Sequence, residues 1–124
     1  AVIVPASLSD FAPKAKKGKV SSGNKDIRLV LCPLPKVLPA LRSRTKVLVG
    51  YKAEVGVPRA ELVRRARSRL SEHGLDIIVA NDLRDVGAGR TKALIITPDG
   101  ELDVDGSKSV LAERVLDAVV KVLR

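Results

Sequence analysis

The sequence is poor in the residues on which thiol, metal and base-stacking chemistry depend. It has one cysteine, one histidine, one phenylalanine and one tyrosine, and neither methionine nor tryptophan. A lone cysteine excludes an intramolecular disulfide and cannot by itself build a zinc site. Two aromatic side chains are too few for a protein that stacks successive bases of a single strand. We therefore expect Cys32 to be a small buried apolar side chain rather than a catalytic thiol.

Long apolar runs are also missing. No segment of the sequence approaches the roughly 20 apolar residues that span a bilayer, and no charged-then-apolar leader opens the chain. We therefore expect a soluble cytoplasmic protein without a membrane partner. The chain begins without methionine, directly on the strand-like residues 1–4. Since a fold seldom begins on a buried strand, we expect it to be an incomplete fragment with residues missing upstream.

Basic charge, in contrast, is abundant. The chain carries 23 lysines and arginines against 14 acidic residues, a formal net charge of +9. Such a surface favours polyanionic partners, which include nucleic acid, nucleotides and phosphorylated metabolites, and composition does not choose among them. The 124 residues are 45% hydrophobic, which fits a single domain with one core.

Strand-like and helix-like segments alternate along the chain. Apolar runs predict strands, and amphipathic or proline-opened segments predict helices. The expected strands are 1–4, 27–31, 46–50 (closed by Gly50), 75–80, 93–97 and 101–104, and the expected helices are 37–44, 58–73 and 110–123. Residues 12–26, rich in lysine, glycine and serine, are expected to form a mobile basic loop.

This alternation predicts an α/β fold of the three-layer Rossmann-like (ribokinase-like) kind. Its sheet would be mostly parallel and covered on both faces, with a terminal hairpin around residues 98–100. Ligands of such sheets gather at the carboxyl ends of the strands. Here those ends are followed by residues 7–11, the segment after Cys32, residues 51–54 and residues 81–82.

Several side chains near these ends could bind a nucleotide. Asp10, at a strand end, could bind ribose hydroxyls, a base amino group or magnesium, and Lys19 could reach phosphate oxygens. Arg65 and Arg69 are spaced to share a helix face with His73 one turn further, a row that could hold a triphosphate. In each case an ordinary solvated charge remains the alternative. No Walker or G-x-G-x-x-G loop occurs, and residues 87–89 (GAG) are better explained as a surface loop.

Four segments, in order, resemble the phosphopantothenate–cysteine ligase domain, which is also the carboxy-terminal part of the bifunctional DNA/pantothenate metabolism flavoprotein. Residues 6–11 (ASLSDF) resemble the family's Ala-Ala-x-Ala/Ser-Asp-Phe/Tyr segment, and residues 18–22 (GKVSS) its lysine segment in the archaeal form. Residues 49–54 (VGYKAE) are similar to Val-Gly-Phe-Ala-Ala-Glu. The most specific match is residues 74–82 (GLDIIVAND).

The resemblance implies a two-step ligase of coenzyme A synthesis. CTP (or ATP) with Mg²⁺ would activate 4′-phosphopantothenate as an acyl-nucleotide, and the amine of cysteine would then form the amide. The full-length enzyme would be a homodimer, and FMN would be needed only if the parent chain also carries a decarboxylase domain. The family's amino-terminal half is absent here, so the isolated fragment is expected to be inactive.

The resemblance also assigns site residues. Lys19 corresponds to the catalytic lysine and Asp10 to the nucleotide-pocket aspartate, while Tyr51 replaces a phenylalanine. Further nucleotide-binding positions are Ala6, Ser7, Leu34, Pro35, Lys36, Arg69 and His73. Residues 34–36 replace the family's Asn-Pro-Asp, and His73 stands where the family has a phosphate-binding lysine. Neither the nucleotide preference nor the second phosphate contact is therefore carried over. No protein-held metal site is predicted.

A different class of function is the alternative. A non-catalytic basic domain could bind nucleic acid through residues 14–19 and the 64–69 segment of the expected helix, with affinity that falls steeply with salt. The positions of Phe11 and Tyr51 favour the nucleotide pocket instead. Both lie in the matched segments at strand ends, and neither is interleaved with the basic residues.

Overall fold

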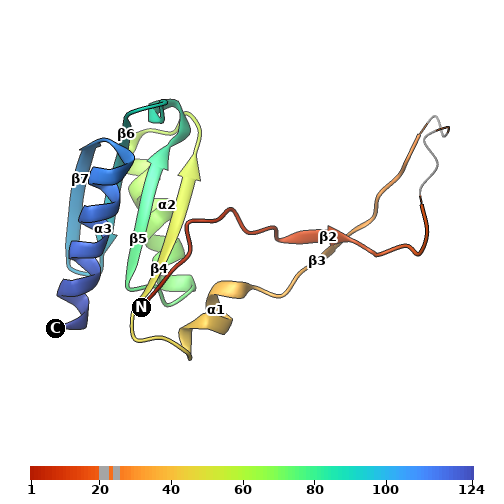
Figure 1. Cartoon of the computed structure of the whole chain (residues 1–124), viewed down its shortest axis with the longest axis horizontal. Coiled ribbons are helices and arrows are strands. Elements are labelled where there is room, and N and C mark those ends of the chain that lie inside the picture. Colours follow the sequence, from red (N-terminus) through yellow and green to blue (C-terminus); the bar gives the residue numbers. More distant parts are fainter. Residues whose placement is uncertain (20–22, 24–25) are drawn as a thin grey trace.

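A computed structural model describes residues 1–19, 23 and 26–124, which form an α/β body and a narrow arm that extends from it (Figure 1). The strands are β1 (Val2–Ile3), β2 (Phe11–Pro13), β3 (Leu31–Pro33), β4 (Leu48–Glu54), β5 (Ile77–Asp82), β6 (Thr91–Thr97) and β7 (Gly100–Gly106). The helices are α1 (Val37–Arg42), α2 (Arg59–Glu72), the short 3₁₀ helix η1 (Leu83–Asp85) and α3 (Lys108–Leu123).

The body is built on a five-stranded sheet in the order β1-β4-β5-β6-β7. β1 pairs with β4, and β4 with β5, in parallel, whereas β6 runs antiparallel to both of its neighbours. Four strands therefore point the same way and β6 alone opposes them. The predicted mostly parallel sheet with a terminal hairpin is confirmed, and Pro98 and Asp99 form the hairpin turn between β6 and β7.

Helices cover both faces of this sheet, so the predicted three layers are confirmed (Figure 1). On one face Leu48 and Ile78 belong to the cluster that includes Leu62 and Ala66 of α2. On the other face the neighbouring strand residues belong to the cluster that includes Val115 and Val119 of α3. Successive strand residues point to opposite faces, which is why the strands are apolar throughout.

The ends of α2 lie where the sequence predicts them. Pro58 precedes the first helical residue, a position at which its fixed φ and missing N–H cost nothing. Gly74 ends the helix with φ +60°, a left-handed conformation that other residues adopt only at a cost. A Cβ atom at Gly74 would also lie 3.4 Å from Cδ of Arg42. Gly74 therefore ends α2 before β5 begins.

The third strand expected from the sequence, 46–50, is longer and does not stop at its glycine. β4 runs to Glu54, with Gly50 inside it. A Cβ atom at Gly50 would lie only 2.7 Å from Cδ1 of Leu75, which is buried. The prediction that Gly50 closes the strand is therefore wrong, since this glycine allows close packing instead of a turn.

The second strand expected for the main sheet, 27–31, is also wrong. Only Leu31 of that run is in a strand, and β3 pairs with β2 in a separate antiparallel two-stranded sheet, the arm. Ile27 and Val30 are 59% and 75% exposed, because no other layer covers them. Cys32, in β3, is half-buried rather than fully buried. Residues 20–22 and 24–25 of the predicted basic loop lie outside the described residues, and its mobility stays a prediction.

Candidate functional site

A cavity of about 390 Å³ opens beside α2, along the edge of the sheet formed by β1 and β4. Small-molecule sites typically occupy roughly 300–1,000 Å³. Its walls come from five parts of the chain: the segment after β1, the start of α1, the end of β4, the last turn of α2 and the end of β5. The lining residues are 4–10, 35–39 and 51–53 together with Arg69, His73, Leu75, Asn81 and Leu83.

An ion pair between Asp10 and Lys36 joins two of these walls. The backbone is joined at the same place, since Leu34 N–H donates to the carbonyl of Asp10 at 2.9 Å. The hydrogen bond and positive charge of Lys36 hold the pKa of Asp10 below its ordinary value, with smaller contributions from Arg69 and His73. Asp10 is therefore an anion at neutral pH, and the other charged residues that line the cavity are the cations Lys36, Lys52 and Arg69.

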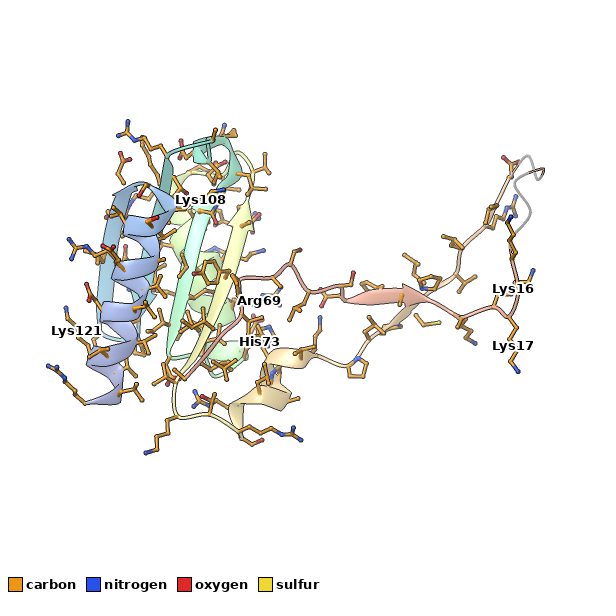
Figure 2. The ribbon with its side chains drawn as sticks, viewed as in Figure 1. Lys16, Lys17, Arg69, His73, Lys108 and Lys121 are labelled. Atoms are coloured by element: carbon orange, nitrogen blue, oxygen red, sulfur yellow. The ribbon has the colours of Figure 1, made fainter. Side chains whose placement is uncertain are left out.

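Arg69 and His73 come from the last turn of α2 and its C-cap, and Figure 2 shows them side by side between the sheet and the root of the arm. Arg69 Nη1 lies 2.9 Å from His73 Nε2. Burial, and then the charge of Arg69, lower the pKa of His73 from its ordinary value of 6.5. The ring is consequently neutral near pH 7, and Arg69 carries the positive charge of the pair.

Tyr51 lies on β4, where alternate side chains face opposite layers. Its ring packs against the core cluster under α3, and burial raises the pKa of its hydroxyl. Its neighbours Lys52 and Glu54 form an ion pair at 2.9 Å, and Glu54 also meets Arg65 of α2 at 3.1 Å. Tyr51 therefore lines the cavity from the sheet, while its ring packs toward the face opposite α2.

Asp82 anchors the loops at the carboxyl ends of β4 and β5. One carboxylate oxygen accepts from the N–H of Gly56 at 2.9 Å, and the other from the N–H of Arg84 at 2.9 Å. Its hydrogen bonds with Arg84 lower its pKa to about 2. The preceding Asn81 lines the cavity. The sequence predicts both residues only as part of a strand end where ligands gather, with no individual role, although both lie within the most specific matched segment.

The structure brings most of the predicted site residues to this one cavity. Those that line it are Ala6, Ser7, Asp10, Pro35, Lys36, Tyr51, Arg69 and His73. Leu34 lies directly beside the lining segment 35–39. Lys19 does not line the cavity, and the nearby Lys16 and Lys17 lie at the far end of the arm in Figure 2. The predicted catalytic lysine is therefore not among the residues that line the pocket of its own chain.

The other arginines of α2 do not form the predicted phosphate-binding row. Arg64 and Arg65 both pair with Glu61, at 2.7 and 2.6 Å. Arg67 meets Glu101 of β7 at 3.3 Å. Of the two arginines predicted to share one face, only Arg69 lines the cavity, and the guanidinium of Arg65 pairs with Glu61 and Glu54.

The chemistry of the cavity suits a phosphorylated, polar ligand more than a metal ion alone. Over residues 1–19, 23 and 26–124, no group of three or more histidine, cysteine, aspartate or glutamate side chains is placed to hold a metal. Lys36, Lys52 and Arg69 offer donors to phosphate oxygens, and Asp10 is the carboxylate among the lining residues.

The described part of the chain contains no helix that is long and apolar enough to cross a membrane.

The sequence is similar to known proteins along nearly its whole length. The sequence matches the model of the DNA/pantothenate metabolism flavoprotein C-terminal domain over residues 1–123. It is 36% identical to the coenzyme A biosynthesis bifunctional protein CoaBC of Methanocaldococcus jannaschii, over 99% of this chain. The chain spans only 31% of that relative's length.

Solved structures show the same fold. The DNA/pantothenate metabolism flavoprotein from Streptococcus pneumoniae superposes with a TM-score of 0.78 at 25% identity, over 92% of this chain and 59% of that one. A Cab2 variant in complex with phosphopantothenate-cysteine superposes with a TM-score of 0.65 at 18% identity, over 92% of this chain and 41% of that one.

Proposed function

This chain belongs to the DNA/pantothenate metabolism flavoprotein C-terminal domain family, and from that premise we propose that it holds the nucleotide in a phosphopantothenate–cysteine ligase. The observation that carries the proposal is the convergence of the matched segments on one cavity. Asp10, Tyr51 and Asn81 come from three of those segments and line it together, with the cation of Arg69 beside them.

The proposed reaction has two steps. A carboxylate oxygen of 4′-phosphopantothenate attacks the α-phosphorus of CTP, and pyrophosphate leaves as the acyl-nucleotide forms. The amine of cysteine then attacks the acyl carbon, the nucleotide monophosphate leaves, and the amine loses a proton as the amide forms. Charge builds up on phosphate oxygens in the first step, so fixed cations are the groups that accelerate it. By itself this chain is not expected to complete the amide.

Different lining residues would bind different parts of the nucleotide. Arg69 would bind the phosphate tail through its forked N–H donors. Asp10, held as an anion, would accept hydrogen bonds from ribose hydroxyls or a base amino group. Ala6 and Ser7 would form the floor after β1, and residues 34–36 the wall beside the base. Mg²⁺ would arrive with the triphosphate, because it commonly keeps phosphate oxygens and one or two carboxylates as ligands.

We propose further that two copies of the chain act together. Phe11 and Leu31 of the arm, and Ile27, Leu29 and Val30 just before β3, are all more than half exposed. An uncovered apolar ribbon of this kind is typical of an interaction surface. A second copy of the arm would cover it, and Lys19 of one chain would then reach the pocket of the other.

Calorimetric titration tests the proposal. Mg-CTP, Mg-ATP and a short DNA duplex are titrated into the wild type, Arg69→Ala, Lys19→Ala and the matched control Arg67→Ala. We expect saturable binding of one triphosphate, weakened roughly tenfold or more by Arg69→Ala and Lys19→Ala, since a hydrogen bond to a charged group contributes about 1.5–3 kcal/mol. Arg67→Ala, which removes a cation paired with Glu101, should bind as the wild type does.

Two results would reject the nucleotide site. One is binding of DNA alone, with a steep dependence on salt, which would support the basic nucleic-acid-binding domain instead. The other is an equal loss of triphosphate affinity in Arg67→Ala and Arg69→Ala, because that would indicate diffuse attraction to charge and no defined pocket.

A further inference from the structure

The contact between Arg69 and His73 restricts what each side chain can do. Arginine has five N–H donors and no acceptor. At 2.9 Å from Arg69 Nη1, His73 Nε2 must therefore be the acceptor. The ring proton then lies on Nδ1, which is buried and has no hydrogen-bond partner among the described residues.

The charges around His73 act on this arrangement from three parts of the chain. Burial lowers the pKa of the ring most, followed by Arg69, and Lys36 at the start of α1 acts in the same direction. Glu72 on α2 and Asp10 on the segment after β1 act in the opposite direction, and the sum is a lowered pKa. A protonated ring would present N–H donors at both nitrogens, and Nε2–H would then face an N–H of Arg69.

We propose that His73 is a positioning residue that holds Arg69 toward the phosphate groups of the ligand by accepting one of its hydrogen bonds. The pocket would then contain one phosphate-binding cation and one neutral acceptor at these two positions. This inference rests on the proposed function, because it takes the anion in the cavity to be the triphosphate of a nucleotide.

The physical advantage lies in the freedom of the arginine side chain. A long, rotamer-rich side chain loses conformational entropy when it is fixed on a ligand. One hydrogen bond to His73 fixes the guanidinium beforehand and leaves its remaining N–H donors for phosphate oxygens. A neutral acceptor does this without adding a second charge that would repel the first.

Two substitutions separate this role from a second phosphate-binding cation. His73→Gln keeps an acceptor at a similar distance along the side chain, whereas His73→Ala removes it. Dissociation constants for Mg-CTP, Mg-ATP and inorganic tripolyphosphate are measured near pH 7.5, with melting temperatures to establish that each variant is folded. We expect His73→Gln to bind within about twofold of the wild type and His73→Ala to bind roughly 2- to 10-fold more weakly. Equal affinities for His73→Ala and the wild type would overturn the proposal.

The pH dependence gives a second, signed readout. As the pH falls from about 7.5 to about 5, protonation of His73 should release Arg69, so the wild type loses affinity relative to His73→Gln. The titration of the ligand's own phosphate is common to both proteins and cancels in the ratio. If His73 acted as a phosphate-binding cation, the wild type would instead gain affinity over His73→Gln at low pH, and that gain would refute the positioning role.

The probes also separate this inference from the proposed function. Binding of tripolyphosphate that depends on His73, without binding of either nucleotide, would reject the nucleotide site and leave the Arg69–His73 pair standing. Nucleotide binding that is indifferent to both His73 variants would do the reverse. If neither nucleotide nor tripolyphosphate binds the wild type, Arg69 holds no phosphate and the positioning role is rejected.

Discussion

The body and the arm are built from similar apolar residues, yet they differ in what covers them. Ile78 in β5 is fully buried between α2 and the neighbouring strands, whereas Ile27, four residues before β3, is 59% exposed. Both lie in runs that predict a buried strand from the sequence alone. An apolar run therefore indicates where a strand needs a partner, but not whether that partner lies in the same chain.

Truncating the same side chain, isoleucine, in both regions should separate them most strongly. Ile78→Ala should lower the free energy of unfolding by about 2–5 kcal/mol, because it leaves a cavity in the packed core. Urea denaturation followed by circular dichroism measures the change. Ile27→Ala, at a concentration where the chain is monomeric, should change it by less than about 0.5 kcal/mol. Similar losses for the two variants would mean that the arm is packed against the body of its own chain.

The next effect is on self-association, and it tests the arm directly. Val30→Asp places a carboxylate on the apolar surface, where covering it by a second chain would bury an unpaired charge. We expect the dissociation constant of the dimer, measured by sedimentation equilibrium, to rise by roughly tenfold or more. The variant should also lose the part of triphosphate affinity that depends on Lys19.

The control is Leu116→Asp, which places a carboxylate on the exposed side of α3. If Val30→Asp associates as the wild type does and Leu116→Asp does not associate, the interface lies on the body and not on the arm.

The smallest effect concerns two carboxylates, Asp82 in the body and Asp10 directly before β2 of the arm. The pKa of Asp82 is lowered to about 2 from its ordinary 3.8, so its stabilising contribution is complete above pH 3.8 and is lost as the pH falls toward 2. Asp82→Asn should remove this part of the acid dependence of the melting temperature. Asp10→Asn should alter it less, because the Asp10–Lys36 pair is about half exposed and screened by solvent. An equal change for both would show that exposure does not separate them.

The sequence predicts the elements of the body well because their signals are local. Pro58 and Gly74 mark both ends of α2, and the hairpin turn follows from Pro98-Asp99-Gly100. The arm could not be predicted, since the choice between joining the main sheet and pairing with β2 is made by distant parts of the chain. The place of Gly50 inside β4 could not be predicted for the same reason, because the contact that requires a glycine there is with the distant Leu75.

The candidate site was predicted residue by residue, but its geometry was not. The matched segments identify Asp10 and Tyr51, and counting back from the segment 74–82 identifies Arg69; all three line one cavity. Motif positions carry no side-chain direction, so they did not indicate that the Tyr51 ring packs under α3 or that Lys19 stands away from the pocket. The role of Asp82 as an anchor depends on the N–H of Gly56 in the next loop, which no local pattern reveals.

The short strand β1 has a consequence for the order in which the molecule assembles. It joins the sheet through only two paired residues, opposite Leu48 and Val49 of β4, and the chain between the two strands must first close into a long loop. From β4 onward, each strand pairs with the next strand along the chain, so residues 47–124 can condense through contacts of low sequence separation, which form fastest. The cavity wall formed by residues 4–10 is then the last part of the body to fold. Folding kinetics followed at the core would be complete before the pocket exists.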